Sequence, residues 1–419
     1  MSLPCTCHVP QVSIGLDFGA THSGVALASS RTCDAHPNQS SPPTILYSQK
    51  FPTVLRRQPG GQRFEFSQES QFPSESGDLL RYFKLALVDP AEQRNPPDVH
   101  AAALLQKTMW NVHVHETISE LVSIYLQGLL EKVVSRLSRV TGSSLGACDV
   151  VISWPELWEN NLSGSLDLLK EAVVLAGISP AFMKSVSYIK EHEAAVRSVL
   201  YYHGDELDRT LKTGNPILVA DCGGITVDAA IYRHPDSTTG SDMIRPLCRV
   251  TGSVVLDVAF REKVVSRILG MTGVREESEI PVDVKRDLQL IMEKWHLKIK
   301  NAFDPFNMRE GSVPFKIQGK DAIITRTEMM KMFDKVTDQI VAVIRELFKS
   351  SLDEGKTPGM DSRGSGCSTF LWETSFELKG GRFYCGRNSR DRMWVGSDRG
   401  STTGLLVRLM HGGAPIVAW

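Results

Sequence analysis

Two similar glycine-centred segments, about 200 residues apart, constrain this chain more than any other feature. Residues 14–21 read IGLDFGAT and residues 218–226 read LVADCGGIT. Each has an apolar run, an Asp, one further residue, a Gly and then a Thr. This pattern predicts a strand, a tight turn and a second strand. The separation is too long for a solenoid repeat, so we expect two similar lobes that face each other.

Strands and helices are predicted to alternate along the rest of the chain, which favours the α/β class. Short apolar runs predict strands over 148–153 and 186–189. Apolar residues at helical spacing predict helices over 118–137, 160–176, 254–269, 283–300 and 327–350. Residues 31–75 are rich in Pro, Ser, Gln and Gly, so we expect a long irregular excursion with short strands at best.

Composition narrows the class of partner. The chain has 419 residues, enough for two or more domains, and its formal net charge of −1 gives no reason to expect nucleic acid or an acidic membrane as a partner. Its eight cysteines are dispersed, which favours reduced thiols over a disulfide framework. No run approaches the roughly 20 apolar residues of a membrane span, and no leader pattern opens the chain. A cytoplasmic location is therefore expected.

The two turns have the chemistry of a phosphate site. Glycine lets backbone N–H groups approach a phosphate closely, and threonine adds a hydroxyl donor. Asp17 and Asp221 stand at the end of the first predicted strand of each pair. A carboxylate favours a phosphate only when a divalent cation lies between them. One such hairpin alone is more often an ordinary β-turn, but the pair predicts a clamp for a nucleotide with Mg²⁺.

Five segments resemble, in the same order, the ATPase domain of the heat-shock protein 70 family, a member of the actin-like ATPase superfamily. The segments are IGLDFGATHSGVAL, VVISWPELW, YIKEHEAAV, ILVADCGGITVDAAIY and RVTGS with the LDVAF that follows. The nearest likeness is to the divergent twelve-A branch and its fungal relatives. The resemblance covers roughly residues 12–350, and the order of the motifs is more specific than any one of them.

The resemblance implies an actin-like (ribonuclease H-like) α/β fold with two lobes and ATP or ADP with Mg²⁺ between them. The implied domains are a disordered N-terminus 1–11, a first lobe 12–212, a second lobe 213–350 and an atypical tail 351–419. Asp17 and Asp221 would hold the waters of Mg²⁺. The residues implied in nucleotide binding are Gly19, Ala20, Thr21, Gly223, Gly224, Thr226, Gly252 and Lys298. Lys298 would touch the ribose or adenine, in an alignment that can slip by a residue or more.

The same resemblance implies four catalytic residues. Glu191 and Asp228 would position the attacking water, Asp221 would hold the metal shell, and Lys84 would balance charge at the γ-phosphate. Phosphoryl transfer depends mainly on positioning and positive charge, so these residue types suit the reaction. Lys84 also fits a plainer interpretation, a lysine at the exposed end of an amphipathic segment.

Three departures weaken the match. Ala20 stands where the family has a threonine, and Ile225 stands where its second motif has a third glycine. A β-branched residue resists positive φ and keeps the backbone away from a ligand. The family's later Gly-Gly adenosine motif is missing after residue 350, where a polar, Gly- and Arg-rich stretch follows. We therefore expect slow or impaired hydrolysis, and a second lobe that lacks its last strands and part of the adenine pocket.

A shift of reading frame offers one explanation of the tail. Trp is encoded only by TGG and Glu only by GAA or GAG, so a frame two bases later gives glycine at the junction of Trp372 and Glu373. The hypothesis is that residues from about 360 onward are an out-of-frame or mis-spliced C-terminal part, and a chance match is the alternative. Nucleotide sequence across this region tests it.

The resulting expectation is an ATP-binding, heat-shock protein 70-like protein with slow ATP hydrolysis and no peptide-binding domain. The nucleotide would be its ligand, and the resemblance adds co-chaperone or client proteins as partners. A first alternative is a non-hydrolysing nucleotide-binding scaffold or switch, favoured by Ile225 and the missing adenosine motif. A second alternative is a small-molecule kinase of the same superfold, although no sugar-pocket constellation is visible.

Overall fold

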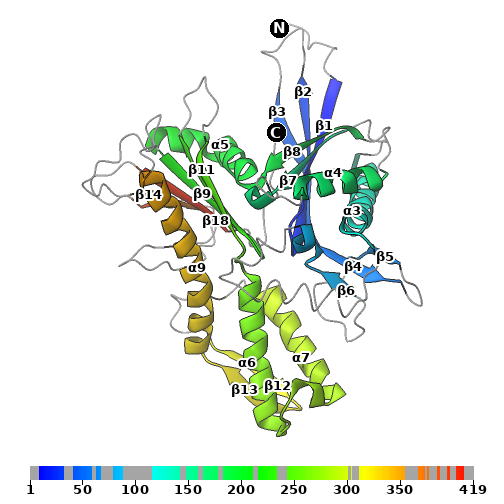
Figure 1. Cartoon of the computed structure of the whole chain (residues 1–419), viewed down its shortest axis with the longest axis vertical. Helices are drawn as coiled ribbons and strands as arrows, with labels where there is room; N and C mark the ends of the chain where they lie inside the picture. The colour runs from blue at the N-terminus through cyan, green and yellow to red at the C-terminus, as the bar shows by residue number, and fades with distance from the viewer. Residues whose placement is uncertain are drawn as a thin grey trace.

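The computed structural model is of mixed α/β architecture, with several sheets and helices (Figure 1). We call the described residues up to 210 the first half and those from 216 onward the second half. The structure describes residues 9–32, 41–58, 63–67, 79–87, 116–141, 148–158, 164–177, 183–210, 216–233, 243–300, 303, 311–353, 367–372, 375–376, 385–386, 394–396 and 403–409.

The first sheet has the strand order β3-β2-β1-β7-β8. Its first three strands form an antiparallel meander, and the last two run parallel to β1. The strands are β1 (Val9–Asp17), β2 (His22–Thr32), β3 (Ser41–Pro52), β7 (Cys148–Trp154) and β8 (Met183–Lys190). Parallel pairing brings the carboxyl ends of β1, β7 and β8 to one edge of the sheet, where ligand sites of such sheets form.

Helices α3 (Ile118–Thr141) and α4 (Ser165–Leu175) share one hydrophobic core with the first sheet. All buried members of this core lie between residues 14 and 176. A small antiparallel sheet borders α3 through the contact of Phe66 with Tyr125. Its strands are β4 (Val54–Arg57), β5 (Phe64–Phe66) and β6 (Leu79–Arg81).

The second sheet has the order β11-β10-β9-β18-β14-β17. It also begins with an antiparallel meander, and it continues with β18 and β14, which run parallel to β9. The last strand, β17, is antiparallel to β14. The two sheets differ in the order of the parallel strands. In the first sheet β7, which precedes β8 in the chain, lies next to β1, whereas in the second sheet β18, which follows β14 in the chain, lies next to β9. The strands are β9 (Pro216–Cys222), β10 (Val227–Arg233), β11 (Met243–Arg249), β14 (Cys367–Trp372), β17 (Trp394–Gly396) and β18 (Thr403–Leu409).

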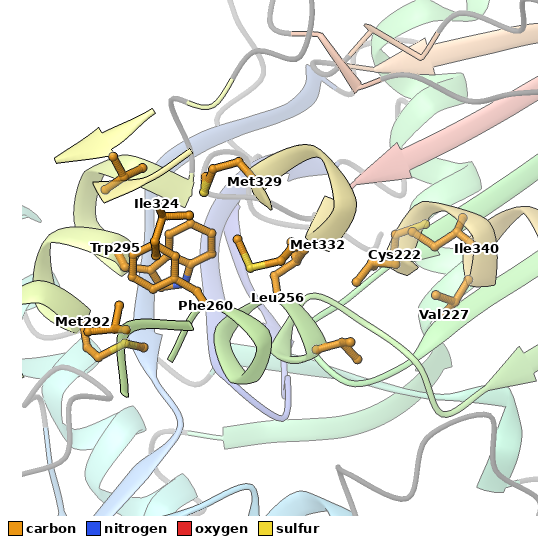
Figure 2. Close-up of a cluster of buried hydrophobic side chains, with 14 of the residues drawn as sticks. Cys222, Val227, Leu256, Phe260, Met292, Trp295, Ile324, Met329, Met332 and Ile340 are labelled. Atoms are coloured by element: carbon orange, nitrogen blue, oxygen red, sulfur yellow. The ribbon is translucent and has the colours of Figure 1, made fainter. Parts of the chain in front are cut away.

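A separate hydrophobic core, with all buried members between residues 218 and 347, supports the second half (Figure 2). Trp295 is fully buried at its centre and stacks on Phe260, with ring centroids 4.0 Å apart. Below the second sheet in Figure 1 lie α6 (Val254–Thr272), α7 (Val282–Lys294) and the hairpin of β12 (Val313–Ile317) and β13 (Lys320–Ile324). Helix α9 (Arg326–Asp353) contacts β10 and β11 of the sheet and extends down towards this hairpin. Each half therefore has its own core.

Helix α5 (Glu191–Thr210) contacts both sheets, and in Figure 1 it lies between β8 and β9. Its first residues therefore sit where the two halves meet. Short helical turns and strands complete the described chain: η2 (Phe83–Leu87), η3 (Glu156–Trp158), η4 (Glu277–Glu279), the π-helical turn η5 (Trp295–Ile299), β15 (Ser375–Phe376) and β16 (Cys385–Gly386).

Both predicted glycine hairpins and the predicted strands near 150 and 188 are confirmed. The expectation of only short strands within 31–75 is wrong, because β3 is 12 residues long. Strand β1 begins at Val9, inside the range predicted as disordered, and residues 1–8 lie outside the described part. The expectation that the tail adds no strands to the second half is also wrong, since β14, β17 and β18 join its sheet. Among the described residues, no helix combines the length and apolarity needed to span a bilayer.

Candidate functional site

The first glycine turn, residues 18–21, joins β1 to β2 and needs a glycine at position 19. A Cβ on Gly19 would lie 2.1 Å from the carbonyl oxygen of His22, so any other residue would force the turn to move. The Gly19 N–H donates to the Asp17 carbonyl at 3.1 Å. The Gly19 carbonyl accepts from Thr53 Oγ1 at 2.7 Å. These bonds hold the turn close to the end of β1.

Asp17 is the last residue of β1 and lies opposite Ser153 of β7 in the parallel register. Ser153 is buried, and its Oγ donates to Asp17 Oδ1 at 3.1 Å. A hydroxyl donor fixes the orientation of a carboxylate without neutralising its charge. Asp17 can therefore act as an oriented anionic group at the edge of the first sheet.

The second glycine turn, residues 223–226, is held against the start of α6. The backbone N–H of Ser253 donates to the Gly223 carbonyl at 3.2 Å, and that of Val254 donates to the Gly224 carbonyl at 2.8 Å. Gly223 closes the turn by donating to the Thr226 carbonyl at 2.8 Å. A Cβ on Gly252 would lie 2.5 Å from Gly224 carbonyl atoms, so glycine at 252 allows this close approach.

The two turns touch each other. A Cβ on Gly224 would lie 2.5 Å from both Oγ1 and Cγ2 of Thr21, and 3.0 Å from its Cβ. Segments more than 200 residues apart in the chain thus come into contact, as the two similar hairpins predict. The structure brings together all the predicted turn residues: Gly19, Ala20 and Thr21 in the first turn, and Gly223, Gly224, Thr226 and Gly252 in or against the second.

Asp221 and Asp228 are direct partners in the antiparallel ladder of β9 and β10. Both side chains are buried. Asp228 Oδ1 accepts the backbone N–H of Glu156 at 3.0 Å. Like charges directly opposite each other on neighbouring strands destabilise a sheet unless something compensates them. The pair is therefore suited to a nearby positive charge.

Lys84 supplies one such charge. Its Nζ lies 2.7 Å from Glu191 Oε1, and both side chains are buried. Nζ also lies 5.6 Å from the ring centre of Phe18 and 5.4 Å from that of Trp158, so two aromatic faces support the ammonium. The interpretation of Lys84 as the exposed end of an amphipathic segment is wrong, because it is 6% exposed.

The pKa values of this ion pair show which groups surround it. Burial lowers the pKa of Lys84, but the Glu191 carboxylate and the charges of Asp17 and Asp228 more than offset it, so the net shift is upward. Burial raises the pKa of Glu191 well above its usual range; Lys84 opposes this shift, and Asp228, Asp17 and Asp221 add to it. Three acidic side chains, those of Glu191, Asp17 and Asp228, therefore act on Lys84, and Asp221 acts on Glu191.

This excess of buried carboxylates fits a bound cation. Within the described residues, no group of three or more His, Cys, Asp or Glu side chains is arranged to hold a metal ion directly. Mg²⁺ does not need such a group, because it keeps several waters and uses one or two carboxylates together with substrate phosphates. Asp17 and Asp221 are the two carboxylates that would hold it through water, one from each half.

A buried polar network beside the site was not predicted. His192 is fully buried at the start of α5, with Nε2 2.8 Å from Glu156 Oε2 and Nδ1 2.5 Å from the Tyr232 hydroxyl. If the Glu156 carboxylate accepts from Nε2–H, then Nδ1 accepts from the Tyr232 O–H. Burial raises the pKa of Tyr232, which keeps its proton. Lys190 also bonds Glu156, at 3.1 Å.

This network links the first half to the second, since Tyr232 lies on β10 and Glu156 follows β7. Through its backbone N–H, Glu156 also orients Asp228. The partners are 36 and 40 residues apart, so no local pattern marks them. The sequence signal was the position of His192 beside Glu191, inside the segment YIKEHEAAV.

Lys298 is not among the residues that the structure brings together, because its side chain is exposed. Lys300, two residues later, is buried and donates to Asp257 Oδ1 at 2.8 Å and to the Ser253 carbonyl at 3.0 Å. Trp295 Nε1 donates to the same Asp257 oxygen at 2.8 Å. Lys300 is thus the lysine of this segment that reaches the start of α6, next to the second turn.

A scan of the chain against models of known protein families finds no match, and a search of curated proteins finds no similar protein. Function is therefore inferred from the residues of this site and their geometry.

Proposed function

We propose that the chain binds ATP or ADP with Mg²⁺ between its halves, in an actin-like, ribonuclease H-like fold of two lobes, and hydrolyses ATP slowly. One observation carries the proposal. Asp17 and Asp221 lie at the ends of corresponding strands in two sheets, and the charges of both act on Glu191, which is buried in an ion pair with Lys84. Both sheets have an antiparallel meander followed by two parallel strands, and this shared plan supports two lobes of similar origin.

The residues present divide the work of binding. The glycine turns allow backbone N–H groups near a phosphate chain, and Thr21 and Thr226 add hydroxyl donors. Mg²⁺, when bound, would supply the positive charge that joins anionic phosphates to anionic Asp17 and Asp221. Ser153 keeps Asp17 oriented for this role.

The residues around Glu191 suit positioning of a water for in-line attack. Its carboxylate and that of Asp228 accept hydrogen bonds, and the Glu156 backbone fixes Asp228. Lys84 offsets negative charge that develops on a transferred phosphoryl group.

Calorimetry with Mg-ATP on the full chain tests binding. We expect Asp17→Asn and Asp221→Asn each to weaken the affinity at least about tenfold, because each removes a carboxylate from the metal shell. Asp321→Asn is the matched control, since Asp321 is an exposed residue of β13 and should leave the affinity unchanged. Equal Mg-ATP affinity in wild type and both site variants would contradict the proposal.

Single-turnover assays then separate hydrolysis from binding. Glu191→Gln should keep Mg-ATP affinity within a few fold and slow phosphate release by about 10²-fold or more. The second candidate, a nucleotide-binding switch that does not hydrolyse ATP, is favoured by Ile225, which is buried where the resembling motif has a glycine. Binding without phosphate release in the wild-type chain would support that candidate. Formation of ADP and a sugar phosphate, without release of free phosphate, on addition of a sugar would instead support a small-molecule kinase.

A further inference from the structure

The two residues that break the glycine and threonine pattern, Ala20 and Ile225, belong to one apolar cluster. Leu85, Ile225 and Val254 are its buried members, at 4%, 3% and 4% exposure. The partly buried residues that pack against them are Ala20, Tyr82, Ala86, Val250 and Val258. We call these eight residues the apolar seam.

The apolar seam crosses from one half of the molecule to the other. Tyr82 and Leu85 belong to the first half, in and just before η2, next to Lys84. Ile225 belongs to the second glycine turn, and Val254 begins α6. Ala20 and Ile225 thus help to join the halves at the place where phosphates would bind. These are the two residues at which the turns depart from the motifs of the family that the sequence resembles.

The backbone segments around the seam also lie in close contact. Thr21 is in contact with Gly224, and Gly252 lies close to the carbonyl group of Gly224. Tyr82 holds a positive φ of 60°, a strained backbone for a residue with a Cβ, and its carbonyl accepts the N–H of Leu85 at 2.8 Å. A phosphate chain between the two turns would need the contact of Thr21 with Gly224 to part.

We propose that the apolar seam is an inhibitory contact that holds the halves together and must open before a phosphate-bearing ligand enters between the turns. The inference that the seam inhibits ligand binding rests on the proposed nucleotide function. The inference that the seam holds the halves together does not. Buried apolar area stabilises the closed state in proportion to its size. The apparent affinity for a ligand is proportional to the fraction of molecules that are open. A protein with a weakened seam should therefore bind the ligand more tightly.

Ile225→Ala and Leu85→Ala test the seam from its two sides in the full chain. Removing buried methylene groups should raise the open fraction about tenfold or more. Hydrogen exchange without ligand reports opening at the amides of residues 223–225 and 252–254. Calorimetry with Mg-ADP reports the affinity, which should increase by a similar factor. Ile340→Ala is the matched control, because Ile340 is buried in the second core and lies outside the seam.

Faster exchange at both segments in Ile225→Ala and Leu85→Ala, but not in Ile340→Ala, supports the closing contact. Unchanged exchange in both seam variants overturns it. Faster exchange with unchanged or weaker Mg-ADP affinity overturns the inhibitory role alone. If neither the wild type nor any variant binds Mg-ADP or Mg-ATP, the proposed function fails. The hydrogen-exchange result still shows whether the apolar seam holds the halves together.

Discussion

Asp221 and Asp228 face each other across the β9–β10 ladder, both buried, with the backbone of Glu156 donating to Asp228. A fold selected for stability alone has no reason to place two acidic side chains opposite each other on adjacent strands. A charge that binds between the halves gives such a reason. This pair therefore offers the most direct way to test whether the site is built for a cation.

Asp228→Asn should stabilise the ligand-free protein by about 1 kcal/mol, because it removes one of two opposed carboxylates and keeps an oxygen for the Glu156 N–H. Denaturant unfolding without Mg²⁺ measures this change. With Mg-ATP present, the gain should shrink or reverse, since the variant loses a group that faces the ligand. A loss of stability without ligand would show that the charge of Asp228 is already compensated within the fold.

Lys84→Met should cost about 3–5 kcal/mol of unfolding free energy, because it leaves Glu191 buried without its positive partner. The double variant with Glu191→Gln should recover much of this loss, since two neutral side chains then occupy the same volume. A double-mutant cycle by urea unfolding measures the coupling. Additive effects of the two changes would contradict a direct, buried ion pair.

Unfolding free energy should depend on pH through Glu191. Its pKa is raised in the folded chain, chiefly by burial, so the native state holds a proton at pH values where the unfolded state has lost it. The stabilising contribution of Glu191 is fully present at pH values below its pKa in the unfolded chain. It falls as the pH rises towards its pKa in the folded chain, by at most about 1.4 kcal/mol per pH unit. Comparison of wild type with Glu191→Gln from pH 5 to 8 isolates the slope. A difference that grows in the other direction would mean that Lys84 outweighs burial.

Gly224→Ala should destabilise the protein by roughly 1–3 kcal/mol, because the new Cβ meets the Thr21 side chain. Gly270→Ala is a matched glycine control in α6, where a Cβ would have no neighbour within 4 Å. It should stabilise by about 0.5–1 kcal/mol, since alanine favours the helix. Thermal unfolding compares the two. Similar effects of both changes would contradict the contact between the turns.

The local patterns of the sequence predicted the elements that carry the glycine turns and the periodic helices. Strand β3 escaped prediction because it lies at the edge of its sheet and pairs only with β2 among the described strands. Two prolines, Pro42 and Pro43, stand near its start, where an edge strand tolerates them. Partial exposure also weakens its hydrophobic pattern, so composition resembled that of a loop.

The sequence predicted the site residues that belong to short motifs. It did not predict the contacts between residues that lie far apart in the chain. Asp17 and Asp221 lie at the ends of strands that the apolar pattern predicts, and the turn glycines follow directly. The bonds of His192 to Glu156 and Tyr232 need the arrangement of both halves, which a single sequence does not reveal. The apolar seam shows the reverse case, since Ala20 and Ile225 were visible as departures but their shared packing was not.

The π-helical turn at Trp295–Ile299 has a consequence for how this segment tolerates length changes. A π turn holds one residue more than the α turn it replaces, so everything after it is rotated and advanced relative to a regular helix. An α turn formed by the same number of residues would rotate Lys300 away from Asp257, whereas deleting one residue would restore α-helical spacing and keep Lys300 in its place. The type of turn, rather than side-chain identity, thus sets the position of this lysine.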